Sequence, residues 1–585
     1  MKTPLFFKTA CLSILSIAIS SCETPNALPK NEVVNNPITY KPVSTGDSIV
    51  KKQETKKPTI PLIIKDNVSA GSTATREEIQ AAPIREGGQV NYSTKAKANV
   101  IFAPVSVPEP TNESYNSVAE NEFTLSTESP LSTFSIDVDK ASYSNCRRFI
   151  TGGSLPPADA VRTEEFINYF DYNYPESPNR PVNIYTEVSS CPWNSANRLL
   201  HIGIQAKKIP FESIKAMNLV FLVDVSGSMN TFNKLPLLKT SLIMLTQKLR
   251  AEDKVSLVAY AGAAGLVLPP TSGSEKNTIL SAIENLSAGG STAGGAGLVL
   301  AYRQAEQSFI KDGINRVILA TDGDFNVGQS SDKDMKDLIE KERENGIAIT
   351  TLGFGMGNYK DSKMETIADN GDGNSFYIDN ADEARKVLVT EIASTLSLVA
   401  KDVKLQLEFN PSKVYAYRLV GYEDRMLKKE DFNNDKKDAG DMGAGHTVTA
   451  LYEIEPADGR TTHVIDPLKY QTSVSKAGAE SNEMLTIKLR YKEPRESQSQ
   501  LITHVVKDGN TPLDKTSGNF RFSAAVAEFG MILHNSKWKG NATLQSAWEL
   551  GADAKGKDME GYRAEFLKLL QTASVLKGQS EIVNR

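Results

Sequence analysis

Histidine, cysteine and tryptophan are scarce in this chain of 585 residues, which has five histidines, four cysteines and three tryptophans. The histidines lie far apart in sequence, so no spacing typical of a zinc site occurs among them. A formal net charge of -5, without a basic stripe, argues against nucleic acid as a partner. The length exceeds what one hydrophobic core supports, so we expect about two to four domains.

The chain also lacks a hydrophobic run long enough to span a bilayer. Its N-terminal apolar stretch, which contains Leu12–Ile19, is roughly a dozen residues long, and two lysines precede it. We interpret residues 1–21 as a signal peptide. The stretch ends in Ser20-Ser21-Cys22, and small residues before a cysteine resemble the lipobox of bacterial lipoproteins. This resemblance implies lipidation of Cys22 and a lipid-anchored protein of the cell envelope, on the periplasmic or surface-exposed face of the outer membrane. An ordinary signal peptide is the alternative.

Two cysteines remain for the folded part of the chain, Cys146 and Cys191. Outside the cytoplasm such thiols can pair. A disulfide between them would close a loop of about 45 residues and stabilise the fold by about 4 kcal/mol in the chain-entropy model. Two buried free cysteines are an equal alternative, because sequence spacing does not report distance in space.

Composition and periodicity divide the rest of the chain. Residues 22–124 are rich in Pro, Ser, Thr, Asn and Lys and poor in aromatics, so we predict a disordered linker. Residues 217–398 alternate apolar strands with helix-length segments, which indicates an α/β domain with a doubly wound, mostly parallel sheet. Residues 399–510 alternate apolar and polar positions as antiparallel strands do, and 511–585 have helical periodicity. The predicted strands of the α/β domain are Leu219–Val223, Val255–Tyr260, Val317–Thr321, Ala348–Leu352 and Phe376–Ile378.

Residues 125–216 contain too few predicted strands to form a domain of their own. Thr133–Asp139 and the stretch around Leu200, Ile202 and Ile204 read as strands, and Val161–Tyr172 reads as an amphipathic helix. We therefore infer that these strands pair with those that follow residue 399. The α/β domain is then inserted into a discontinuous antiparallel β-rich domain with C-terminal helices.

Polar side chains lie at the carboxyl ends of predicted strands and in the loops that follow them. The candidate metal ligands are Asp224, Ser226, Ser228, Thr292 and Asp322. Parallel sheets bind ligands at the carboxyl ends of their strands, where both aspartates fall. Hydroxyls flanked by carboxylates suit a hard divalent cation, which prefers oxygen ligands. The sequence therefore predicts metal-assisted binding rather than catalysis, and we nominate no catalytic residue.

This region resembles the von Willebrand factor type A domain, which has a Rossmann-like fold. The metal ion-dependent adhesion site (MIDAS) of that family reads D-x-S-x-S, then a threonine, then an aspartate that ends a strand, and all five positions match here. The resemblance implies Mg²⁺ (or Mn²⁺) as cofactor and an acidic group of a partner as a further ligand. The flanks, including Cys191–Trp193 and Gly443–His446, resemble the YfbK type of bacterial von Willebrand A proteins.

We therefore expect a metal-dependent protein-binding module, for adhesion or assembly, in a bacterial cell-envelope lipoprotein, and not an enzyme. Its partner would be an envelope protein that presents an acidic residue. One alternative is a metal-dependent hydrolase that acts on an envelope component, with Mg²⁺ polarising an ester or phosphoryl oxygen. Another is an envelope scaffold that docks through its C-terminal helices.

Two weaker patterns have simpler interpretations. Asp137 and Asp139 could be paired carboxylates for acid–base catalysis, but their Ser, Thr and Lys neighbours favour a solvated strand edge. Gly353–Gly357 follows a predicted strand and hints at a dinucleotide-binding loop, but its spacing is wrong and a plain strand-to-helix turn is favoured.

Overall fold

The computed structural model of the protein describes a large part of the chain. The described residues are 113–117, 119–290, 294–323, 325, 332–357, 359–459 and 481–578. The predicted signal peptide, Cys22, most of the predicted linker and Thr292 lie outside the described residues. None of the helices within these ranges is long and apolar enough to cross a membrane.

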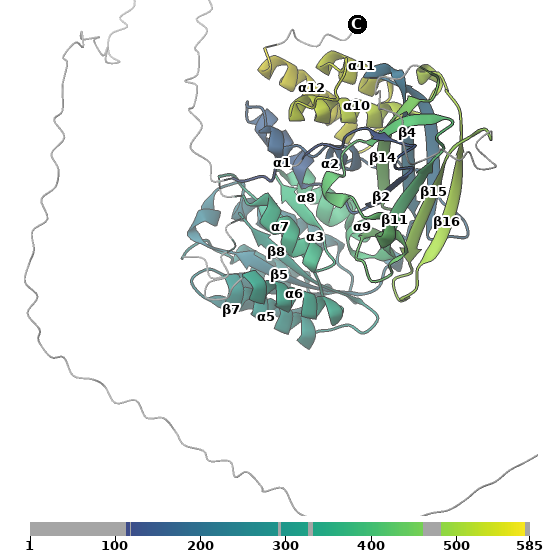
Figure 1. The fold of residues 1–585 in the computed structure, drawn as a ribbon. Helices are drawn as coiled ribbons and strands as arrows, with labels where there is room; N and C mark the ends of the chain where they lie inside the picture. The colour runs from purple at the N-terminus through teal and green to yellow at the C-terminus, as the bar shows by residue number, and fades with distance from the viewer. Residues whose placement is uncertain are drawn as a thin grey trace, which may run out of the picture. The chain divides into compact units, whose positions relative to one another are not determined.

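A six-stranded sheet, in the order β10-β9-β8-β5-β6-β7, forms the α/β domain (Figure 1). Its strands are β5 (Met217–Asp224), β6 (Lys254–Tyr260), β7 (Ala264–Ser272), β8 (Ile314–Thr321), β9 (Ala348–Phe354) and β10 (Ser375–Ile378). Neighbours are parallel except at the edge, where β7 pairs antiparallel with β6. The five predicted strands are confirmed. The sequence does not predict β7, because Pro269 and Pro270 interrupt it; an edge strand tolerates proline, which has no N–H to donate.

Helices cover both faces of this sheet. They are α3 (Leu235–Lys248), α4 (Lys276–Glu284), α5 (Gly294–Gln307), α6 (Asp332–Glu344), α7 (Asp361–Asn370), α8 (Ala381–Arg385) and α9 (Ile392–Leu396). Leu219, Phe221 and Val223 of β5 pack with α3, α4, α8 and α9, whereas Val220 and Leu222 pack with α5, α6 and α7. Alternate residues of a strand point to opposite faces, so this continuously apolar strand is buried on both sides.

Two antiparallel sheets form the β-rich domain. The first, in the order β1-β12-β14-β4-β3, contains β1 (Thr124–Leu125), β3 (Val182–Cys191), β4 (Asn194–Ala206), β12 (Val414–Leu419) and β14 (Thr447–Pro456). The second contains β2 (Leu131–Ser135), β11 (Leu398–Phe409), β13 (Gly440–Gly443), β15 (Glu483–Lys492) and β16 (Gln500–Lys507). β4 pairs with β14 and β2 pairs with β11, and the two sheets share one apolar core. The prediction of an inserted α/β domain is therefore confirmed.

Helices from both ends of the described chain build a third core. They are α1 (Ala141–Thr151), α2 (Thr163–Asn168), α10 (Gly518–His534), α11 (Leu544–Asp553) and α12 (Tyr562–Leu576). In Figure 1 the yellow α10, α11 and α12 lie above the dark α1 and α2. The helix predicted at Val161–Tyr172 is shorter than expected, because only Thr163–Asn168 is α-helical. Cys146 and Cys191 are free and buried in this core, so the disulfide is not formed and the free-thiol alternative holds.

The last part of the predicted disordered linker is folded. The Glu113 carboxylate pairs with Arg148 of α1 at 2.9 Å, and β1 pairs with β12. Glu113 also accepts a hydrogen bond from the backbone N–H of Gly357 at 2.8 Å. The described residues before 125 therefore dock on the helical core, the β-rich domain and the α/β domain, which corrects the predicted boundary of the linker.

Candidate functional site

The candidate metal ligands gather where β5 and β8 end. These strands are parallel neighbours, with Val223 opposite Ala320, so their carboxyl ends lie side by side. Asp224 is the last residue of β5, and Asp322 directly follows β8. Both aspartates are buried, with 0% and 1% of their surface exposed. The register of the sheet thus brings together two carboxyl groups that are far apart in sequence.

Asp224 is held by hydrogen bonds on both oxygens. Its Oδ1 accepts from the backbone N–H of Ser226 at 2.8 Å. Its Oδ2 accepts from the hydroxyls of Tyr260, at 3.3 Å, and Thr321, at 3.2 Å. Burial raises the pKa of Asp224 above its ordinary value, and the nearby charge of Asp322 adds to this. Because these bonds fix its carboxylate, Asp224 can contact a cation directly or through water.

Two serine hydroxyls stand beside each other in the loop that follows β5. The Oγ atoms of Ser226 and Ser228 are 3.0 Å apart. Ser226 is buried, whereas Ser228 is exposed, at the start of the short helix η3 (Gly227–Asn230). The two hydroxyls therefore lie between the buried carboxylates and the solvent. A metal site with one open coordination position needs such access to solvent.

The glycine-rich loop comes close to the same place. The backbone N–H of Gly227 donates to the carbonyl of Gly290 at 3.1 Å, and that of Gly289 donates to the carbonyl of Val225 at 2.7 Å. Thr292 is two positions after Gly290 but lies outside the described residues, so its role as a metal ligand stays a prediction.

Lys234 is a site residue that sequence reasoning missed. It precedes α3, and its Nζ pairs with Asp322 Oδ2 at 2.8 Å, with 8% and 0% of the two side chains exposed. A lysine six positions after D-x-S-x-S carries no signal of its own in a single sequence. The glycines after β9 explain the contact, because Gly355 packs against the lysine side chain.

The donor set fits a hard divalent cation. It offers two neutral hydroxyls and two carboxylates, all of them oxygen ligands. Buried carboxylates are costly unless positive charge compensates them, and Lys234 compensates one of the two. The described residues contain no group of three or more His, Cys, Asp or Glu side chains that could hold a metal ion. A site built partly from hydroxyl ligands does not require such a group.

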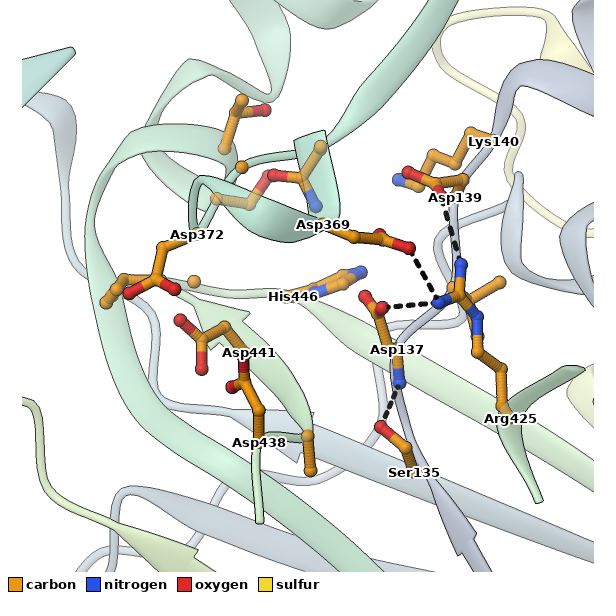
Figure 2. A pocket seen from close by; sticks show the side chains of 18 of the residues that line it. Ser135, Asp137, Asp139, Lys140, Asp369, Asp372, Arg425, Asp438, Asp441 and His446 are labelled. Carbon is orange, nitrogen blue, oxygen red and sulfur yellow. Dashed lines mark hydrogen bonds and ion pairs between the residues drawn. The ribbon is translucent and has the colours of Figure 1, made fainter. Parts of the chain in front are cut away.

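A second polar region lies between the α/β domain and the β-rich domain. It is a cavity of about 280 Å³, lined by aspartates from both domains, with Arg425 and Arg316. Figure 2 shows the guanidinium of Arg425 turned toward Asp137, Asp139 and Asp369. Arg425 pairs with Asp137 at 2.9 Å and with Asp139 at 3.2 Å.

The expectation of a solvated strand edge for Asp137 and Asp139 is wrong for Asp139. Only 5% of Asp139 is exposed, and its carboxylate also accepts from the backbone N–H of Ser375 in β10 at 2.8 Å. Burial raises the pKa of Asp139 well above its ordinary value, and the negative charges of Glu365, Asp137 and Asp369 add to this. Arg425, almost 300 positions later in the chain, provides the counter-charge that the local sequence could not reveal.

Family comparisons match three parts of the chain. The von Willebrand factor type A domain family matches residues 218–390, the family described as von Willebrand factor matches 109–201, and "Uncharacterized protein YfbK, C-terminal" matches 394–576. The uncharacterized protein YfbK of Escherichia coli (strain K12) is 43% identical over 499 residues, which cover 84% of this chain and 85% of that protein. The chain belongs to the YfbK family of von Willebrand factor type A domain proteins.

Other similarities of this YfbK-family chain are more partial. An uncharacterized protein of Synechocystis sp. is 30% identical over 190 residues, which cover 32% of this chain and 44% of that protein. The solved von Willebrand factor type A protein of Catenulispora acidiphila has a TM-score of 0.34 at 16% identity and covers 68% of this chain and 91% of its own. BatB of Bacteroides thetaiotaomicron has a TM-score of 0.27 at 22% identity, with 30% and 97% covered. The type A domain itself indicates a protein-interaction module.

Proposed function

We propose that this YfbK-family protein is a metal-dependent protein-binding module, for adhesion or assembly, of a bacterial cell-envelope lipoprotein. Mg²⁺ or Mn²⁺ would be held by Asp224, Ser226, Ser228, Thr292 and Asp322. When bound, the ion supplies an open coordination position for an acidic group of the partner. The membrane attachment would be a lipid on Cys22, with the linker as a tether.

One observation carries this proposal. The paired hydroxyls of Ser226 and Ser228, 3.0 Å apart, stand at the same sheet edge as the buried carboxylates of Asp224 and Asp322. Few structural needs would bring two carboxylates and two hydroxyls together where strands end, whereas a hard cation needs this set of oxygens. Tyr260 and Thr321 orient Asp224, as outer partners orient the ligands of a metal site.

The surface around this strand end favours a protein as the ligand. Phe232, in the loop before α3, is 84% exposed, and Met356, in the loop after β9, is 54% exposed. The two loops touch, because Lys234 of the first packs on Gly355 of the second. Exposed aromatic and methionine side chains beside a polar site are typical of protein-binding surfaces.

Metal titration and partner capture test the proposal together. We expect calorimetry to show Mn²⁺ or Mg²⁺ binding to the purified protein. Ser228→Ala, which removes an exposed hydroxyl ligand, should lower that affinity by at least about tenfold without lowering the melting temperature. Capture of envelope proteins on the immobilised chain, identified by mass spectrometry, should require the metal and should be lost in EDTA and in Ser228→Ala.

Ser274→Ala is the matched control, because Ser274 is an exposed serine whose hydroxyl contacts that of Ser272 and not a candidate metal ligand. It should bind metal and partner as the unchanged protein does. Partner capture that persists undiminished in EDTA, or an unchanged metal affinity in Ser228→Ala, would contradict the proposal.

A further inference from the structure

We propose that the ammonium group of Lys234 acts as a fixed positive charge inside the candidate metal site. This charge competes with the metal ion for Asp322, and it makes the metal-loaded site prefer an anionic group of the partner. This inference rests on the proposed function and adds to it a residue that determines specificity. It concerns a side chain outside the D-x-S-x-S, threonine and aspartate positions that define the MIDAS.

The geometry places the ammonium group within the ligand set. Lys234 Nζ is 2.8 Å from Asp322 Oδ2, and the lysine side chain is 8% exposed. An ammonium group that has lost most of its water depends on its carboxylate partner for compensation. A cation that approaches Asp322 must therefore share this carboxylate with Lys234 or displace the ammonium group from it.

Gly355 keeps the lysine in this place. A Cβ atom at Gly355 would lie 2.2 Å from Lys234 Cε, and the residue has a φ of +79°, which favours glycine. The glycine after β9 therefore leaves room for the lysine stem, whose ammonium group reaches the neighbouring strand end. The need to accommodate the lysine side chain thus explains why Gly355 is a glycine, and a dinucleotide-binding role for Gly353–Gly357 is not needed to explain it.

The charges of three side chains decide what the site attracts. Asp224 and Asp322 contribute two negative charges and Lys234 one positive charge, so a divalent cation leaves this group with one net positive charge. A carboxylate from a partner then neutralises it. Without the lysine, the loaded group would be neutral, and a carboxylate would add an uncompensated negative charge in a buried site. Lys234 therefore lowers metal affinity and raises the preference for an acidic partner group over a neutral one.

Lys234→Met separates these two effects. Because the competing charge is gone, we expect Mn²⁺ to bind the purified full chain at least about tenfold more tightly by calorimetry. Acetate, used as a carboxylate probe of the Mn²⁺-loaded protein, should bind at least about tenfold more weakly, as measured by its effect on the Mn²⁺ electron paramagnetic resonance spectrum. Lys234→Arg keeps the charge and should stay close to the unchanged protein in both measurements.

Lys239→Met, in the helix α3 that Lys234 precedes, is the matched control, since the ammonium group of Lys239 donates to the Glu284 carbonyl and not to a candidate metal ligand. If Lys234→Met does not fold, Gly355→Ala moves the lysine stem instead and should shift Mn²⁺ affinity in the same direction. Gly357→Ala controls for backbone strain, because Gly357 has a φ of +95° but nothing within 4 Å of the added Cβ.

The outcomes distinguish this inference from the proposed function. If the unchanged protein binds Mn²⁺ and Lys234→Met binds it with the same affinity, the inference is overturned and the proposed function stands. If neither protein binds Mn²⁺, both fail. If Lys234→Met binds Mn²⁺ and the unchanged protein does not, the ammonium group has replaced the metal, which supports the competition and overturns the proposed function.

Discussion

A single buried charge connects the helical core of this protein with its α/β domain. Arg147 of α1, 2% exposed, pairs with Asp379 and Glu383 at the end of the α/β domain and with Glu565 of α12. Its guanidinium also donates to the hydroxyl of Tyr169 at 2.9 Å. One side chain thus connects the segment before the α/β domain, the domain itself and the C-terminal helices.

Removing this arginine should be strongly destabilising. Arg147→Met keeps most of the volume but leaves the buried carboxylates of Asp379 and Glu383 without their partner, which costs about 3–5 kcal/mol. Urea unfolding followed by circular dichroism measures the loss. Lys515→Met, at an exposed pair with 72% of each side chain accessible, should change stability by less than about 0.5 kcal/mol. A loss below about 1 kcal/mol in Arg147→Met would contradict the inferred role.

At the residue scale, the sequence predicts the members of a site when they share a local motif or directly follow a clear apolar strand. Asp224, Ser226 and Ser228 lie within five positions, and Asp322 directly follows a clear apolar strand. The partners of Arg147 and Arg425 lie as much as 418 and 288 positions away, and nothing in a single sequence pairs charges over such distances.

At the scale of elements, the sequence predicts strands with regular apolar patterns and misses those without them. β11, β14 and β15 alternate apolar and polar residues, whereas β13 has glycine at both ends and β7 contains two prolines. The two glycines of β13 are required by close contacts with distant backbone segments. A Cβ at Gly443 would lie 1.7 Å from the carbonyl oxygen of Ser394, and one at Gly440 would lie 2.3 Å from the backbone nitrogen of Asp137.

A carboxyl group in β13 should make the free energy of unfolding of the protein depend on pH. Burial raises the pKa of Asp441 in β13 from its ordinary 3.8 to about 8; the negative charges of Asp372 and Asp402 add to this, and Lys401 opposes it. Between about pH 4 and pH 8 the folded state therefore binds a proton at Asp441 that the unfolded state has released. The free energy of unfolding then falls as pH rises through this window.

Asp441→Asn keeps the shape of the neutral carboxyl group and removes this titration. We expect the variant to lose less stability than the unchanged protein between about pH 5 and pH 8, and to be the more stable of the two at the upper end. Urea unfolding at several pH values gives both curves. Asp514→Asn, at a side chain that is 72% exposed, should leave the dependence unchanged. Parallel curves for Asp441→Asn and the unchanged protein would show that Asp441 does not titrate as described.

At the scale of the whole molecule, the insertion decides which parts can fold alone. The α/β domain has apolar residues of its own on both faces of its sheet. The β-rich domain has its sheets completed by segments on both sides of the insertion, because β2 pairs with β11 and β4 with β14. The sequence allowed this topology to be inferred from a strand count, but not which strands pair, since register depends on contacts between distant segments.

Dividing the chain at the insertion tests this account. We expect residues 217–398 to unfold cooperatively on heating, because their sheet is complete. Residues 399–578 should not, because β11 and β14 would expose the edges that β2 and β4 cover and the shared core would lose the inward-facing side chains of β4. Residues 113–216 joined to 399–578 by a flexible glycine–serine linker supply the missing strands and should regain a cooperative transition and antiparallel-sheet circular dichroism. If 399–578 alone melts as sharply as the joined chain, the strands before the insertion add little, and the β-rich domain is complete without them.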